Sequence, residues 1–557
     1  MRRLSFSKQL WTEYKYFILS TFSIVVLGAI LRFYQLGSVP HGLAWDEAAI
    51  GYNGYAIFTT RRDEWLTRLP ISFRSFGDYK APLAIYINGF STAIFGLTPF
   101  AVRLPFVLSS IAGVIGFIAL TLELWRFDKH KAGMMAVAAL SIVTLPWHFH
   151  YSRIAFESGL ALSLVLWSLW SWFRFVIDRR ITWQLFWITI STFSASASLY
   201  AYHSSKITVP LMFAILVILH WRRLVERRWG VFLGLVLASV TLFPLGKDAI
   251  SADGLQRAEV TVFSQTNNPI EALGLTFKNL LTHLHPDFLV LGQTTSLRHG
   301  DGVWGVLLPT TYFLVLTGFL YVLWQFVQSK RLKSELQSYQ WSVRVSTSIF
   351  LILFGLLPAA IGSEVPHSNR ALLAIPGFLF MALHGVEALW AWAARIPVNQ
   401  KIRGTHGEYD IVRKALFGTL LLLHLLEFTA YTNHYFYEFS HNSAAAFTDG
   451  YIEAFSIAHQ YEKGVDIDQP VDTILVSDKY GQPYIYALFV RKTNPIWYQG
   501  GSLQKYQFSS TLSISDLDRK NALIIATPND NLPTERAFKT IYGSDSSPRF
   551  YLYLNQL

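Results

Sequence analysis

The sequence contains no cysteine and few charged residues. Of its 557 residues, 15% are charged, whereas an average soluble protein has about 25%. Without cysteine the chain forms no disulfide, binds no metal through thiolates and has no catalytic thiol. The low charge, together with a hydrophobic content of 52% and an aromatic content of 16%, is typical of a protein embedded in a membrane.

The distribution of charged residues also indicates a membrane protein. A net charge of +11 is also found in proteins that bind nucleic acids, but here the cations gather in short stretches between apolar segments. In a membrane protein such stretches set the orientation of the helices. We therefore expect the lipid bilayer, and no nucleic acid, as a partner.

Eleven segments are long and apolar enough, or nearly so, to cross a bilayer, which takes roughly 20 residues. They are 16–36, 104–122, 132–150, 158–176, 181–200, 206–221, 229–246, 303–329, 345–362, 371–394 and 415–432. The last is the weakest because Glu427 lies inside it. A basic leader precedes the first segment and no small-residue cleavage site follows, which predicts a retained anchor with a cytoplasmic N-terminus.

A twelfth candidate, "PLAIYINGFSTAIFGLTP" from Pro82, is uncharged but short and contains glycines. If it does not cross, the cytoplasmic loops hold 23 Lys and Arg, and the three short outer loops hold only Arg153, Lys206 and Arg370. If it crosses, every later loop inverts and "WRRLVERRW" faces outward. Positive residues favour the cytoplasmic side, so we predict that this segment lies in or dips into the outer interface.

The resulting organisation has two parts. Residues 1–432 form a polytopic α-helical membrane part with long outer loops at 37–103 and 247–302. From residue 433 the composition changes, and helix-like "AAAFTDGYIEAFSIAHQYE" alternates with strand-like "DTILVSD", "ALIIATP" and "RFYLYL". Residues 433–557 therefore read as a small extracytoplasmic α/β domain.

Titratable side chains gather in six segments on the predicted outer side. These side chains are Asp46, Glu47, Asp78, Lys80, Arg153, Glu157, His203, Lys206, Arg298, His299 and Arg370. Their convergence on one face of a membrane protein predicts a functional site there. His283 and His285 are too sparse to indicate a metal site.

Each of these residues also has a structural interpretation. Asp46 can cap a helix that begins at Glu47, and an acid in a first helical turn is favoured by the helix dipole. Arg153 and Glu157 are four apart and can form an ordinary helical ion pair. A cation at a helix end commonly anchors the helix in the interface.

The order of several motifs resembles glycosyltransferase family 39. The motifs are the Asp46-Glu47 pair, "DYKAPLAIY", "RLPFVLSSIAGVIG" and an acidic residue after the third span. The family contains protein O-mannosyltransferases and bacterial transferases that place aminoarabinose on lipid A, and its members are GT-C class membrane enzymes. "PDFLVLGQTTSLRHGDGVWGVLLP" and "GQPYIYALFVRKTNP" look like bacterial members. The resemblance covers the full length and is strongest over 30–160 and 280–310.

The resemblance implies roles for four residues. Asp46 matches the proposed catalytic base, and Glu47 matches the second acid of the pair. Lys80 matches a lysine that contacts the donor phosphate, and Glu157 falls where relatives carry a second acidic site. The sequence departs from the family in having Lys-Ala-Pro where many relatives have Lys-Pro-Pro, and Glu157 where the lipid A enzymes have Asp.

The family also implies a donor in which one phosphate links a sugar to a long polyprenol. A lipid phosphate leaves without a proton from the enzyme, so the reaction needs one base and positive charge rather than the two carboxylic acids of glycoside hydrolases. Asp46 supplies the base, and Lys80, with Arg370 and either Arg153 or Lys206, supplies the charge. Direct displacement inverts the anomeric centre, and the acceptor is an extracytoplasmic glycan, lipid or protein hydroxyl.

Two alternatives stay open. One is an oligosaccharyltransferase-like enzyme that uses a lipid-linked oligosaccharide and a divalent metal held by Asp46, Glu157 and their neighbours. The other is a lipid or polysaccharide transporter, although transport sites usually lie near mid-membrane and often between repeated halves. We expect no cofactor. The family resemblance and the absence of N-x-Ser/Thr sequons predict a bacterial inner membrane.

Overall fold

The described part of the chain is mainly helical. The computed structural model describes residues 2–556 except for several gaps. The gaps are 127, 129, 250–260, 267, 329–334, 394, 396–407, 466, 468, 499 and 501–502. Parts of the predicted outer loop 247–302 and of the basic stretches 123–131, 330–344 and 395–414 therefore lie outside the described residues.

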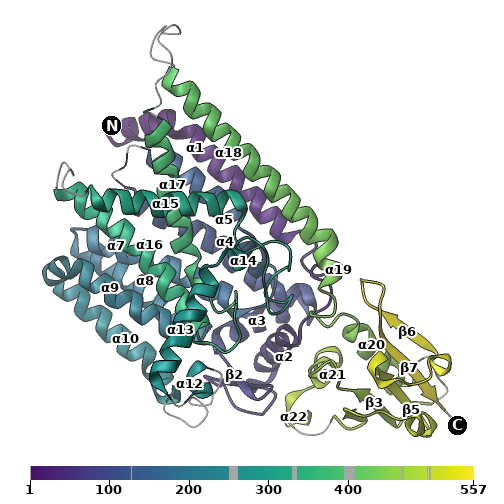
Figure 1. Ribbon diagram of the computed structural model, residues 1–557. Helices are drawn as coiled ribbons and strands as arrows, with labels where there is room; N and C mark the ends of the chain where they lie inside the picture. The colour runs from purple at the N-terminus through teal and green to yellow at the C-terminus, as the bar shows by residue number, and fades with distance from the viewer. Residues whose placement is uncertain are drawn as a thin grey trace.

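Each of the eleven segments predicted to cross the membrane contains helix (Figure 1). Within the described residues, eight helices are long and apolar enough to cross a membrane. They are α1 (Arg2–Phe33), α4 (Pro99–Leu124), α7 (Glu157–Ile177), α9 (Ser205–Glu226), α10 (Arg228–Ala249), α15 (Pro309–Val327), α16 (Glu335–Ile361) and α17 (Ile375–Ala393). The other predicted segments contain α5 (Lys131–Val143), α8 (Ile181–Ala201) and α18 (Glu408–Asn433). The structure thus confirms a polytopic helical membrane protein.

The predicted span 132–150 is not one helix. α5 ends at Val143, and α6 (Pro146–Tyr151) starts after a two-residue break. Proline disfavours a helical conformation in the residue before it, and Leu145 is extended, with φ −69° and ψ 119°. Pro146 itself fits the first turn of α6, where its missing N–H has no helical partner to lose. The helix is therefore interrupted here, and His150 and Tyr151 belong to α6 rather than to α5.

The first outer loop is folded. It contains α2 (Trp45–Thr60), an antiparallel hairpin of β1 (Phe73–Ser75) and β2 (Asp78–Lys80), and α3 (Pro82–Phe95). With 14 residues, α3 is about 21 Å long, which is less than the roughly 30 Å of a hydrocarbon core. α2 and α3 touch at Gly54 and Gly89, where a Cβ on Gly89 would lie 2.7 Å from the Gly54 carbonyl oxygen. Whether α3 lies in the outer interface stays a prediction.

The second outer loop contains three short elements in its described part, and these lead into α15. They are α12 (Val262–Gln265), α13 (Pro269–Leu284) and α14 (Pro286–Leu289). The segment after α14 has little regular structure and carries Arg298 and His299. It is tied back by Gly305, whose backbone N–H donates to the Val290 carbonyl at 2.9 Å.

The C-terminal part is an α/β unit, as the sequence predicts. Its five-stranded sheet has the order β4-β3-β5-β7-β6, with β3 parallel to β4 and β5, and β7 antiparallel to β5 and β6. The strands are β3 (Thr473–Ser477), β4 (Tyr506–Ser509), β5 (Ala522–Ala526), β6 (Lys539–Tyr542) and β7 (Pro548–Asn555). The helices of this unit are α20 (Tyr451–Glu462), α21 (Pro483–Arg491) and α22 (Pro495–Tyr498).

The C-terminal unit and the first outer loop share one hydrophobic core. Ile50 and Tyr52 of α2 belong to the same buried cluster as Ile485 and Phe489 of α21. Figure 1 shows α21 and α22 beside α2 and the hairpin at one end of the helical bundle, with the sheet beyond these two helices. The membrane part continues into this unit through α18, six π-helical residues (His434–Phe439) and α19 (Ser440–Asn442). Residue 433 therefore marks a change of composition within a continuous helical connection.

Candidate active site

Asp46 lies in the first turn of α2 but does not cap it. The helix begins at Trp45, and the N-cap residue is Ala44. The capping bond comes instead from Glu47, whose Oε2 accepts the Ala44 backbone N–H at 3.1 Å. The interpretation of Asp46 as the cap of a helix starting at Glu47 is therefore wrong, because the neighbouring acid has that task.

Asp46 is paired with two cations from other segments. Lys80, the last residue of β2, donates from Nζ to Asp46 Oδ1 at 2.6 Å. Arg298, from the segment between α14 and α15, donates from Nη1 to Asp46 Oδ2 at 3.3 Å. The side chains of Asp46 and Arg298 are 20% and 21% exposed, so a ligand can reach both. Positions 46, 80 and 298 thus meet although they are far apart in sequence.

The two cations control the charge of Asp46. Burial alone raises the pKa of this carboxyl group, but Lys80 and Arg298 outweigh it and lower the pKa below its usual value. Asp46 is therefore ionised at neutral pH and is able to accept a proton. Arg298 is itself held over the ring of Trp45, with 4.3 Å from its guanidinium carbon to the ring centroid.

Glu47 has a different environment from Asp46. Its side chain and that of Arg103 are both 0% exposed. Arg103 Nε donates to Glu47 Oε1 at 2.9 Å, and the Ala155 backbone N–H donates to the same oxygen at 2.9 Å. The remaining nitrogens of Arg103 donate to the carbonyls of residues 36, 40 and 42. This geometry is that of a structural ion pair that holds the loop before α2.

Arg153 is also enclosed. It is 0% exposed, and its guanidinium donates to the carbonyls of Leu31, Arg32 and Val39 at 2.8, 2.9 and 3.1 Å. It thereby satisfies the C-terminal end of α1. The alternative of a helical ion pair with Glu157 is wrong, because Arg153 precedes α7 and is directed to α1. The same contacts leave Arg153 no exposed N–H for a phosphate.

His299 and Arg370 border the Asp46 cluster. The His299 ring lies against the His367 ring with 4.3 Å between centroids, and Tyr151 contacts its Nδ1 at 3.2 Å. Burial, assisted by the neighbouring Arg298, lowers the pKa of His299 to about 3, so this ring is neutral. Arg370 is 25% exposed and lies 3.8 Å from the carboxylate of Glu364.

The remaining predicted residues lie at the ends of elements on the same side of the bundle. Glu157 is the first residue of α7 and is largely buried. His203 lies between α8 and α9, and Lys206 is in the first turn of α9. Asp78 is two residues before Lys80 on β2, which puts both on one face of the hairpin. Within the described residues, no group of three or more His, Asp or Glu side chains is placed to hold a metal ion.

The C-terminal unit contacts the start of α2, which agrees with the expectation that this unit sits above the outer opening. Gly481, which follows β3, has φ +81°, and a Cβ there would lie 3.2 Å from the ring of Trp45. Leu43, three residues before Asp46, has a carbonyl that accepts bonds from the Tyr486 hydroxyl at 2.8 Å and the Thr448 hydroxyl at 3.0 Å. In the sequence, the "GQPYIY" string marks this part of the C-terminal unit, but it does not indicate which of its residues contact α2.

Comparisons with known proteins show a sequence match to one family over part of the chain and a similar fold over nearly all of it. Residues 79–245 match the sequence model of the family described as dolichyl-phosphate-mannose-protein mannosyltransferase. The matched region includes Lys80 and Glu157. No curated protein sequence matches the chain significantly.

Among solved structures, the chain is similar to ArnT from Cupriavidus metallidurans. The apo form has 13% sequence identity and a TM-score of 0.50, and the match covers 95% of this chain and 96% of ArnT. The form bound to undecaprenyl phosphate has 12% identity and a TM-score of 0.51, covering 95% and 97%. An oligosaccharyltransferase from Archaeoglobus fulgidus with a tethered acceptor peptide has 14% identity and a TM-score of 0.48, covering 86% and 64%.

At this level of identity the structural similarity shows a shared fold. The structural match covers almost the whole of ArnT, and the family match runs from β2 into α10. Taken with the eight helices of membrane-spanning length among the described residues, these findings show a multi-pass membrane protein with a fold similar to that of ArnT.

Proposed function

We propose that the protein transfers a sugar from a polyprenyl phosphate to a hydroxyl group of an extracytoplasmic acceptor, with inversion at the anomeric carbon. The observation that carries this proposal is the Asp46 carboxylate held between Lys80 at 2.6 Å and Arg298 at 3.3 Å. An ionised base and two accessible cations in one place are the groups that such a displacement requires. The undecaprenyl phosphate in the similar ArnT structure supports the donor class.

Asp46 acts as the general base. It accepts the proton of the acceptor hydroxyl as that oxygen attacks the anomeric carbon. The bond from the anomeric carbon to the phosphate oxygen breaks at the same time, and its electron pair leaves with the lipid phosphate. One proton moves to Asp46 and one sugar moves to the acceptor, so no second acid is needed at the leaving group.

Lys80 and Arg298 receive the charge that develops on the leaving phosphate. Both donate to Asp46, so an incoming phosphate competes with the carboxylate for the same N–H groups. Sharing the cations with a phosphate weakens their hold on Asp46 and makes that carboxylate a stronger base. Arg370, a quarter exposed and near His299, adds positive potential at the same side of the site.

We further propose that this site faces the extracytoplasmic side of a bacterial inner membrane, with the N-terminus in the cytoplasm. The support is the distribution of cations, which are concentrated in the loops at the other ends of the helices. The C-terminal unit then lies outside the cell membrane, above Trp45 and Asp46, where an acceptor approaches.

The test uses membranes that contain the full chain and labelled polyprenyl phosphate sugars. We expect sugar transfer to be accompanied by an equal amount of free polyprenyl phosphate, and both products to disappear in Asp46→Asn. A transporter would move the lipid without releasing polyprenyl phosphate. Transfer by Asp46→Asn at the rate of the unchanged protein would overturn the assignment of the base.

A further inference from the structure

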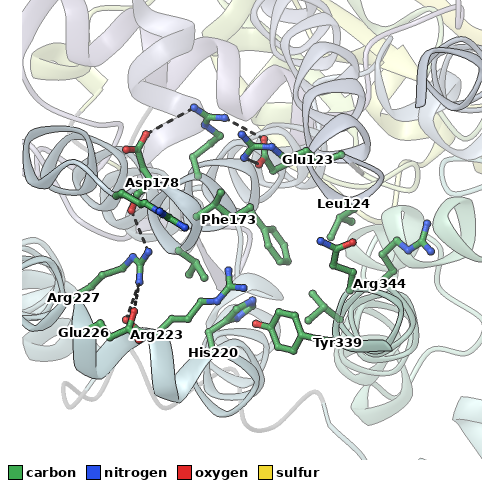
Figure 2. A pocket seen from close by; sticks show the side chains of 17 residues that line it. Glu123, Leu124, Phe173, Asp178, His220, Arg223, Glu226, Arg227, Tyr339 and Arg344 are labelled. Atoms are coloured by element: carbon green, nitrogen blue, oxygen red, sulfur yellow. Dashed lines mark hydrogen bonds and ion pairs between the residues drawn. The ribbon is translucent and has the colours of Figure 1, made fainter. Parts of the chain in front are cut away.

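A second site lies at the end of the helical bundle opposite Asp46. A cavity of about 730 Å³ is lined by the last turns of α4, α7 and α9 and by the first described side chains of α16 (Figure 2). α4 begins at Pro99, four residues before Arg103, and α7 begins at Glu157, so both helices start near the candidate active site. The 21 residues of α7 span about 31 Å, so the two sites are separated by about one hydrocarbon thickness.

The lining of this cavity is strongly basic. Six arginines and three carboxylates line it. The arginines are Arg126, Arg174, Arg179, Arg223, Arg227 and Arg344, and the acids are Glu123, Asp178 and Glu226. Several of the arginines are neutralised, since Arg174 lies 3.4 Å from Glu123 and Arg344 lies 2.9 Å from Glu387. The net positive charge of the lining must therefore come from arginines that have no carboxylate partner.

Arg223 and Arg179 supply that excess. Within the described residues, neither has a carboxylate within the 4.0 Å of an ion pair, and Arg179 is exposed. The Arg223 guanidinium lies 5.0 Å from the centroid of the Tyr339 ring, and Figure 2 shows both side chains along the same side of the cavity. Cations beside a hollow between helices favour an anionic ligand that brings the missing negative charge.

The cavity also lies at the depth of lipid head groups. Trp221 and Trp229, at the adjoining ends of α9 and α10, are 57% and 64% exposed. Exposed tryptophans on membrane helices are enriched at the boundary between hydrocarbon and water. The Arg222 guanidinium lies 5.6 Å from the Trp221 ring, on the outer surface beside the cavity.

We propose that this arginine-lined cavity binds the phosphate-bearing head group of an anionic phospholipid from the leaflet opposite the candidate active site. Basic pockets between membrane helices are suited to such head groups, whose negative charge they complement while the acyl chains stay in the bilayer. The bound lipid then ties together α4, α7, α9 and α16. This binding requires neither Asp46 nor the sugar donor, so it stands independently of the proposed reaction.

The test measures lipid retained by the purified full chain in a neutral detergent, by native mass spectrometry, during titration with phosphatidylglycerol or phosphatidylcholine. We expect preferential retention of phosphatidylglycerol. Arg223→Gln should weaken this retention about fivefold, since one arginine near an anionic surface contributes about 1 kcal/mol, and adding Arg179→Gln should weaken it further. Arg179 is exposed, so its substitution tests the site without disturbing buried contacts.

Arg222→Gln is the matched control, because this neighbouring arginine does not line the cavity. It should retain phosphatidylglycerol within about twofold of the unchanged protein. An equal loss in Arg222→Gln and Arg223→Gln would mean a general surface attraction and would overturn the site. Binding of glycerol phosphate as tight as that of the lipid would overturn the lipid assignment. Asp46→Asn should bind the lipid normally, which separates this result from the transfer assay.

Discussion

The two carboxylates at the start of α2 are adjacent in sequence, but their surroundings differ in every respect that bears on chemistry. Glu47 and Arg103 are fully buried, and each oxygen of Glu47 accepts bonds from protein N–H groups. Asp46 is 20% exposed, and its partners Lys80 and Arg298 are also reachable from outside. A buried pair with all its bonds satisfied holds a loop, whereas an accessible pair can exchange its partners for a substrate.

The largest effect should come from removing the carboxylate of Asp46, the proposed base. Asp46→Asn keeps the shape of the side chain and abolishes its basicity, so we expect a fall in transfer rate of about 10²- to 10⁴-fold. The thermal midpoint and expression should stay close to those of the unchanged protein. The measurement is the rate of sugar transfer at saturating donor. A nearly normal rate would show that Asp46 is not the base, and Asp46 would then have a structural role like that of Glu47.

Glu47→Gln should lower the stability of the protein more than its affinity for the donor. It leaves the buried Arg103 guanidinium without its carboxylate, which typically costs about 3–5 kcal/mol. We expect a clear loss of thermal stability and of correctly folded protein, whereas the protein that does fold should retain a Michaelis constant near normal for the donor. Thermal unfolding in detergent is the measurement, and equal stability of Glu47→Gln and Asp46→Asn is the contrary result.

Lys80→Ala tests whether the Lys80 ammonium group, which is bonded to Asp46, also binds the donor phosphate. Loss of one charge-assisted bond to a phosphate should raise the apparent Michaelis constant for the donor about 10- to 100-fold, while the constant for the acceptor changes little. Lys80→Arg should recover part of the donor affinity because it restores the charge. Equal effects on donor and acceptor would argue against a phosphate contact at Lys80.

Glu64 offers a third case, a buried carboxyl group bonded to an amide. Asn53 donates to it at 3.3 Å, and burial raises its pKa to about 8 from an ordinary 4.5. The folded protein therefore holds this proton more tightly, and stability falls as the pH rises from about 4.5 to 8. Glu64→Gln should flatten this part of the pH profile of the thermal midpoint. An unchanged profile would contradict the assignment.

The smallest effect is expected from a chelator. Asp46 is held by a lysine and an arginine, an arrangement suited to an anion rather than to a divalent cation. We expect transfer in excess EDTA within about twofold of that with added Mg²⁺ or Mn²⁺. Strict dependence on either metal would favour the oligosaccharyltransferase-like alternative.

Sequence patterns predicted the helices well because apolar runs of about 20 residues have few other stable forms. The prediction of one continuous helix over 132–150 was wrong. Pro146 did not decide the question, because a proline near a helix end can either kink the helix or begin a new one. The α/β character of the C-terminal unit was confirmed. Its attachment to α2 was not predictable, since the shared core joins Tyr52 to residues more than 400 positions away.

The sequence predicted which residues lie near the site, but it predicted the role of only some of them. Topology placed Asp46, Lys80 and Arg298 on one side, and the structure brings these three together. Arg153 had the same sequence signature as a phosphate ligand, a cation at a helix end. Only the three carbonyls of residues 31, 32 and 39 that accept its bonds show that it is used internally.

The hydroxyl groups of Thr448 and Tyr486 donate to the carbonyl of Leu43, just before Asp46. During biosynthesis the membrane helices precede these two residues, so the ribosome completes the bundle before it makes the partners of Leu43. The segment that carries Asp46, the proposed base, thus gains these two hydrogen bonds only after Thr448 and Tyr486 have been made. A chain lacking residues after 443 should therefore insert into the membrane without gaining activity.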